Sequence, residues 1–138
     1  IRRWEYASFF KKAPGTSNYA NTRSGSNDEL HIVIEDEDGE ITGTAGQIIE
    51  TYENLSVAFD AKGVDGRTIF YKDVINNKSQ WIWWLRHFEG GSNLGGAASS
   101  TFGNPGSLPD NRSFTQGRDG PQPSDGNYNL AFNEFNDN

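Results

Sequence analysis

The chain has 138 residues, of which 33% are hydrophobic, and it carries a formal net charge of −7. This length supports one domain with a modest core, and the acidic charge argues against nucleic acid as the main partner because it repels phosphate backbones. The chain contains no cysteine, which excludes disulfides and thiolate zinc sites, and no apolar run approaches the ~20 residues of a membrane-spanning helix.

The first segments are polar apart from a group of aromatic side chains. Residues 1–12, IRRWEYASFFKK, predict a strand or a short helix. Residues 13–17 have the composition of a turn, and residues 18–28 are rich in Asn, Ser and Gly and predict a loop. Regular structure in this region is therefore expected only within the aromatic segment.

An acidic hairpin is predicted next. Alternation of apolar and polar residues over residues 29–35 indicates a β-strand. The apolar face of this strand consists of Leu30, Ile32 and Ile34. The strand runs directly into the carboxylates of residues 35–38, and Gly39 marks a turn. Residues 41–44 are then expected to return as a short strand.

Three further elements are predicted in the middle of the chain. Residues 48–55 fit a strand better than two turns of helix, because Thr and Tyr favour sheet. Residues 68–71 predict a strand, and residues 72–78 predict a short helix. The run QWIWWL at residues 80–85 is the most apolar in the chain and predicts a buried strand.

The last third of the chain has a different composition. Residues 89–126 are rich in Gly, Ser, Asn and Pro and predict a loop longer than compact domains usually contain. Residues 127–138 predict the start of a helix that is cut short, and the chain begins without Met, so we expect a piece of a longer polypeptide. The expected fold class is α+β: a mixed or antiparallel β-sheet with a few short helices and long Gly-, Asn- and Pro-rich loops.

The acidic run does not fit an EF-hand calcium loop. With Gly39 at the sixth position, Ile34 occupies the first and Ala45 the twelfth, where oxygen ligands are required. A looser calcium site remains open, built from Glu35, Asp36 and Asp38. The favoured interpretation of the run is a solvated hairpin tip.

Enzyme chemistry finds little support in the sequence. The two histidines are His31, within a predicted strand, and His87, at the end of the QWIWWLRHF run, and no serine lies in a G-x-S-x-G elbow. No glycine-rich phosphate loop is present. We therefore expect a protein that is not an enzyme, with no catalytic, cofactor-binding or metal site.

The tryptophans of the apolar run support an alternative from another functional class. Aromatic rings stack on sugars, and a pair of carboxylates held across a cleft can hydrolyse glycosides. The alternative function is therefore a carbohydrate-binding or calcium-dependent adhesion module. The favoured interpretation instead places Trp81 and Trp83 on one buried strand face and Trp84 on the other.

Short blocks that occur in one order along the chain resemble the contractile tail sheath protein of large myoviruses. The blocks are PGTSxY from residue 14, RSGSNDExH from 23, DEDG from 36, GTxG from 43, IExYxNLS from 49, DAK from 60, Gly66, and YKDVINxxSxWI from 71. The order of the blocks makes the resemblance specific, and it covers residues 11–88. Residues 117–120, GRDG, and the predicted helix at 128–135 resemble a later segment of sheath proteins.

This resemblance implies a structural virion protein of the phage tail, assembled in the cytoplasm of the bacterial host. Sheath subunits form hexameric rings that stack into a helical lattice around the tail tube, between the baseplate and the tail terminator. Contraction drives the tube through the host envelope for genome delivery, and the energy is stored in metastable subunit contacts. No nucleic acid, membrane or cofactor is implied as a partner.

The resemblance also implies an organisation for this chain. Residues 1–88 correspond to a sheath-like, β-rich core segment from the middle of the subunit, residues 89–126 to a loop, and residues 127–138 to the start of a truncated helix. The lattice-forming arms lie outside such a portion, so the chain alone is not expected to polymerise or contract. The hairpin carboxylates are candidates for a protein interface with a basic neighbour, and the alternative is an acidic surface that keeps a concentrated virion protein soluble. These candidates are Asp36, Glu37, Asp38 and Glu40.

Overall fold

The computed structural model describes residues 4–86, 93–103 and 111–115. The helix predicted over residues 127–138 lies outside the described residues, as do His87 and much of the loop predicted over residues 89–126. The description that follows concerns the described ranges.

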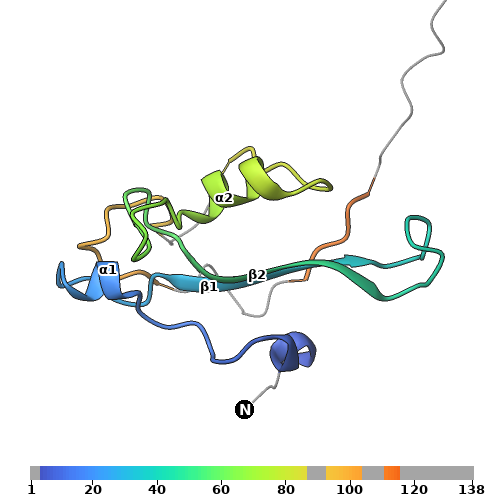
Figure 1. Cartoon of the computed structure of the whole chain (residues 1–138), viewed down its shortest axis with the longest axis horizontal. Helices are drawn as coiled ribbons and strands as arrows, with labels where there is room; N and C mark the ends of the chain where they lie inside the picture. The colour runs from blue at the N-terminus through green and yellow to red at the C-terminus, as the bar shows by residue number, and fades with distance from the viewer. Residues whose placement is uncertain (1–3, 87–92, 104–110, 116–138) are drawn as a thin grey trace, which may run out of the picture.

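The described residues contain one two-stranded antiparallel sheet, which organises the molecule (Figure 1). Strand β1 (Glu29–Asp36) pairs with strand β2 (Gln47–Ser56), with Leu30 opposite Leu55. Shifts in register interrupt the ladder after Leu30 and after Ile34. Both long strands expected in this part of the sequence are confirmed, and the fold is broadly α+β.

Three short helices occur within the described ranges: η1 (Glu5–Phe9, a 3-10 helix), α1 (Asn18–Asn21) and α2 (Tyr71–Lys78). Helix α2 confirms the short helix predicted there. Helix α1 corrects the loop predicted over residues 18–28. It forms because the hydroxyl of Ser17 accepts a 3.1 Å hydrogen bond from the N–H of Ala20, which caps the first turn.

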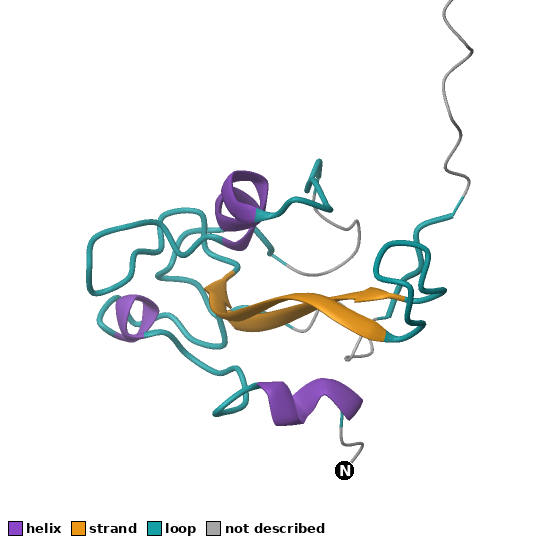
Figure 2. Cartoon of the chain, turned by 45° about the vertical axis from the view of Figure 1, so that its right-hand side comes forward, coloured by secondary structure: helices purple, strands orange, loops and turns teal. Residues whose placement is uncertain are grey.

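The strand pair separates two sides of the molecule. Helix η1 lies on one side of the strands and α2 on the other, and both views agree on this (Figures 1 and 2). We call these the η1 side and the α2 side. The hairpin loop at residues 37–46 projects at one end of the sheet, and α1 lies toward the opposite end (Figure 1). A partner on the η1 side therefore meets different residues from a partner on the α2 side.

The core forms where α2 packs near the C-terminal end of β2. Tyr71 and Ile75 of α2 are almost completely buried and share one cluster with Leu55. Phe102, from the described part of the long loop, is buried in the same cluster. Leu30 packs against it from β1, on the strand face that the alternation predicted.

Two of the predicted strands are wrong as elements. Residues 41–44 form turns instead of a return strand, because the loop folds around the buried carboxylate at the end of β1. Residues 68–71 make only isolated bridges, to Lys62 and to Ser56, because α2 already begins at Tyr71.

The prediction of a buried strand at residues 80–85 is also wrong. The side chain of Asn76 accepts a 2.7 Å hydrogen bond from the N–H of Trp84 and donates a 3.0 Å bond to its carbonyl. The hydroxyl of Ser79 accepts a 3.0 Å hydrogen bond from the N–H of Ile82. These side chains satisfy backbone groups that a neighbouring strand would otherwise pair.

Candidate interaction site

The four acidic residues expected at an interface have two different environments. Asp36 is buried, whereas Glu37, Asp38 and Glu40 are exposed in the hairpin loop. Glu37 accepts a 2.6 Å hydrogen bond from the hydroxyl of Ser113. Solvent therefore reaches the exposed three at the hairpin tip, whereas Asp36 is enclosed.

Asp36 organises the hairpin loop. Its carboxylate accepts hydrogen bonds from the N–H groups of Gly39 and Ile41 at 3.1 Å and of Thr42 at 2.7 Å. It also accepts a 2.8 Å hydrogen bond from the hydroxyl of Thr42. Burial opposes the ionised form, but these hydrogen bonds outweigh it and lower the pKa of Asp36. Its carboxylate is therefore an acceptor for its own loop.

The loop does not assemble a calcium site. Across the described ranges, no three His, Asp or Glu side chains form a group that could hold a metal ion. Glu35, one of the three carboxylates of the looser site, accepts a hydrogen bond from the hydroxyl of Tyr6. The carboxylate of Glu35 thus binds a residue of η1, and the carboxylate of Asp36 binds groups of the loop.

The contact between Tyr6 and Glu35 ties η1 to β1. The hydrogen bond to Glu35 raises the pKa of Tyr6 to about 12, with further contributions from burial and from the negative charges of Glu35, Glu5 and Glu37. These carboxylates give the η1 side a negative potential near the hairpin. Phe9 adjoins them, since its ring centroid lies 6.5 Å from that of Tyr6.

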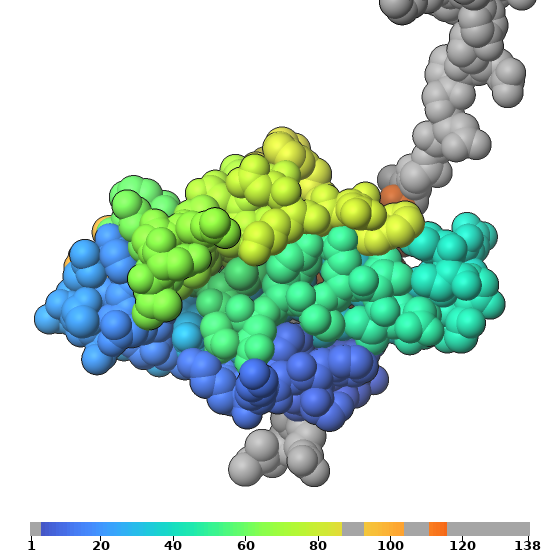
Figure 3. All heavy atoms as spheres, viewed as in Figure 1, coloured from blue at the N-terminus to red at the C-terminus, as the bar shows by residue number. Residues whose placement is uncertain are grey.

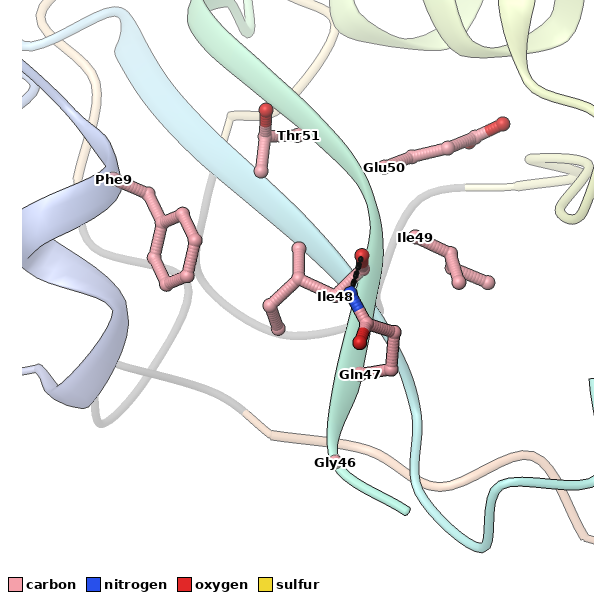
Figure 4. Close-up of a pocket in the computed structure, with 7 residues that line it drawn as sticks. All are labelled: Phe9, Gly46, Gln47, Ile48, Ile49, Glu50 and Thr51. Atoms are coloured by element: carbon pink, nitrogen blue, oxygen red, sulfur yellow. Dashed lines mark hydrogen bonds between the residues drawn. The ribbon is translucent and has the colours of Figure 1, made fainter. Parts of the chain in front are cut away.

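An open pocket of about 380 Å³ lies beside Phe9, between η1 and β2. Phe9 and Ile48 face each other across it, whereas the side chain of Glu50 points away from Phe9 (Figure 4). Its size is at the lower end of small-molecule pockets, about 300–1,000 Å³. Its described lining, Phe9 and residues 46–51, contains no histidine or lysine to pair with Glu50. Phe9 and Ile48 therefore give the pocket apolar surface on two facing sides.

His31 has a structural role. Its Nδ1 accepts a 3.0 Å hydrogen bond from the N–H of Asn54, so Nε2 carries the proton and donates to the carbonyl of Lys12 at 2.8 Å. The ring stacks on Phe10 with 4.4 Å between centroids. Both ring nitrogens are occupied by the fold, which leaves neither for proton transfer.

The sequence did not predict the buried hydrogen-bond network around Asp28. The carboxylate of Asp28 is fully buried and accepts hydrogen bonds from the N–H and the hydroxyl of Ser17, both at 2.7 Å, and from the hydroxyl of Ser56 at 2.6 Å. The three residues lie in different sequence blocks. No local pattern marks them as one cluster, because the pairing of β1 with β2 brings Ser56 to Asp28 and the fold of the segment before β1 brings Ser17 there.

Glu50 fastens the segment after α2 to the sheet. Its carboxylate accepts hydrogen bonds from the hydroxyl of Ser79 at 2.7 Å and from the N–H of Gln80 at 2.9 Å. The hydroxyl of Tyr52 donates a third, at 2.9 Å. Burial opposes ionisation of Glu50, but these bonds outweigh it and lower its pKa.

The segment fastened by Glu50 exposes apolar side chains in alternation. Trp81, Trp83 and Leu85 are 49%, 69% and 77% exposed, and we call them the Trp ridge. Trp84 points inward, with its ring 4.8 Å from that of Tyr71 between centroids. The expectation that Trp81 and Trp83 lie in the core is therefore wrong. Figure 3 shows residues of this segment, in yellow, on the surface above β2.

The chain was compared with protein-family models, with curated proteins and with solved structures, and none matches. Within the ranges that the structure describes, no helix has the length and apolar character needed to cross a membrane. The functional conclusion therefore depends on the residue blocks and on the contacts that they make.

Proposed function

We propose that the chain is part of a contractile tail sheath subunit, a structural protein of the myovirus virion. The observation that carries the proposal is the convergence of the residue blocks that resemble the sheath. Ser17, Asp28 and Ser56 come from three of these blocks and share one buried hydrogen-bond network. These residues of the sheath-like blocks thus hold the fold together, and a stable fold is what a protein with a mechanical function requires.

Further contacts join the same blocks. Glu50 binds the hydroxyl of Ser79 across 29 positions of sequence, and His31 accepts from the N–H of Asn54 across 23. Each contact would leave a polar group without its partner if one block were altered alone, at a cost of about 1–3 kcal/mol where the group is buried. The fold of this chain therefore ties these blocks to one another.

In this role the chain works through its surfaces. Other subunits of the rings and lattice, the tail tube, the baseplate and the tail terminator are the proposed partners. The exposed carboxylates Glu37, Asp38 and Glu40 supply a negative tip for a basic patch on a neighbour, and such charge pairs set the register between repeated subunits.

Immunogold labelling of virions tests the proposal. Antibodies raised against the chain are applied to extended and contracted tails of the myovirus that encodes it. Gold along the whole length of the tail, retained on the shortened tail after contraction, is the expected result. Gold confined to tail fibres or to the baseplate, or gold on heads alone, would overturn the assignment.

The exposed tryptophans favour a second candidate, a carbohydrate-binding module. Trp81 and Trp83 present two rings to solvent, as sugar stacking requires. Thermal unfolding with and without oligosaccharides separates the candidates, because a ligand that binds only the folded state raises the melting temperature. A rise that Trp83→Ala abolishes would support the module, and an unchanged melting temperature is expected for the sheath.

A further inference from the structure

The Trp ridge is an ordered apolar surface. Its neighbour Trp84 is packed on Tyr71, and Asn76 holds both backbone polar groups of Trp84. The carbonyl of Leu85 accepts a 2.9 Å hydrogen bond from Lys72 Nζ. On the other side of Trp83, Ile82 packs against the core and its N–H donates to the hydroxyl of Ser79. The exposed side chains are therefore held outward by anchors before and after Trp83, which lowers the entropy that a partner must remove on binding.

The pocket beside Phe9 offers a complementary shape on the other side of the sheet. Phe9 is 55% exposed and faces Ile48 across an open space of about 380 Å³ (Figure 4). This volume suits one large side chain better than an extended ligand. The segment that carries the Trp ridge follows α2 and lies on the α2 side of the strands, whereas η1, which carries Phe9, lies on the other side (Figures 1 and 2). One copy therefore has the ridge and the pocket on opposite sides of the sheet.

The charges around the two surfaces have opposite signs. Lys72 and Arg86 place positive charge beside the Trp ridge, since Lys72 Nζ binds the carbonyl of Leu85 and Arg86 follows Leu85 in the chain. Carboxylates adjoin the pocket, since Glu5, Glu35 and Glu37 all act on the pKa of Tyr6, beside Phe9. Opposite potentials of this kind favour approach of one surface to the other and oppose contact between two like surfaces.

We propose that the partner of the Trp ridge is a second copy of this chain, with Trp83 of one copy seated in the pocket between Phe9 and Ile48 of the next. Because the two surfaces differ and lie on opposite sides of the sheet, the contact is head-to-tail and repeats from copy to copy. The inference rests on the proposed function for its biological role. It also revises the expectation that this portion does not associate alone.

Sedimentation velocity of the full chain over a range of concentrations tests the contact. The weight-average mass is expected to rise above the 15.3 kDa of the monomer as concentration increases. Trp83→Ser and Phe9→Ser, both at exposed positions, are each expected to remain monomeric. Val64→Ser, at a fully exposed valine outside both surfaces, is the matched control and should associate as the wild type does.

Mixing the two defective variants gives the sharpest outcome. The Phe9→Ser copy retains a ridge and the Trp83→Ser copy retains a pocket, so the mixture is expected to form dimers of twice the monomer mass and nothing larger. A wild type that is monomeric at every concentration overturns the contact, as does a mixture that stays monomeric. The failure of this contact can be told apart from the failure of the proposed function. If the full-length polypeptide forms tubes but this chain stays monomeric, the sheath assignment stands and the contact is wrong. If this chain associates but the full-length polypeptide forms no tubes, the contact stands and the sheath assignment is wrong.

Discussion

The hydroxyl of Ser56 donates a 2.6 Å hydrogen bond to the carboxylate of Asp28, 28 positions earlier in the chain. Ser56 ends β2 and Asp28 precedes β1, so the bond closes the sheet at the end opposite the hairpin. Ser17 joins from the cap of α1. One buried carboxylate thus connects three segments of the fold.

Replacing Asp28 is expected to destabilise the protein. In Asp28→Asn the amide nitrogen meets hydroxyl and N–H donors that need an acceptor, which leaves buried groups unpaired at a cost of about 1–3 kcal/mol. Urea unfolding measures the loss. Asp65→Asn, at a solvent-exposed turn residue, is the matched control, and an equal effect of the two changes would contradict the role of Asp28.

Asn76→Ala is expected to release the segment that carries the Trp ridge. The change removes both hydrogen bonds to the backbone of Trp84, at about 1–2 kcal/mol in unfolding free energy. Hydrogen exchange at the Trp84 amide should accelerate. Asn77→Ala provides the control, because the side chain of Asn77 donates to the carbonyl of Asp73 on the exposed face of α2. Unchanged exchange at Trp84 in Asn76→Ala would show that other contacts hold the segment.

The stability that the hydrogen bonds of Glu50 contribute is expected to depend on pH. Its pKa in the folded protein is lowered from the ordinary value of 4.5, so its contribution is present above pH 4.5 and is lost as the pH falls through the lowered pKa. Glu50→Gln should therefore be less stable than the wild type at neutral pH, by about 1–2 kcal/mol. The difference should shrink in acid, and a difference that is constant with pH would exclude this role of the charge.

Tyr6 is expected to ionise late. Its pKa is raised from 10.0 to about 12, so the contact with Glu35 contributes fully below pH 10 and is lost as the pH rises toward 12. Absorbance titration of tyrosinate should show a late component that Tyr6→Phe reduces. Burial raises the pKa of Tyr71 to about 12 as well, so part of the late component should survive in Tyr6→Phe. A late component of unchanged amplitude in Tyr6→Phe would contradict this contact.

The sequence predicted those elements whose signal is local. Alternation at Leu30, Ile32 and Ile34 placed β1, and the segment that became α2 was correctly expected as a short helix. The buried strand at residues 80–85 failed because sheet propensity describes what a segment prefers when a partner strand is present. Here Asn76 provides the hydrogen bonds in place of a strand.

The candidate site was predictable only in part, for the same reason. The acidic run marked an exposed hairpin tip, which Glu37, Asp38 and Glu40 form. Asp36 turns inward because it accepts hydrogen bonds from groups as far ahead as Thr42, six positions later in the chain. The composition of the acidic run does not identify such donors. The pocket beside Phe9 was out of reach as well, because η1 and β2 are distant in sequence and meet only in the fold.

Electron microscopy of the full-length polypeptide, purified without its tail tube and negatively stained, tests the central claim most directly. The account predicts tubular polymers built from stacked rings. Monodisperse particles that instead gain thermal stability with calcium or glycans would contradict it, and would identify a binding module in place of a sheath subunit.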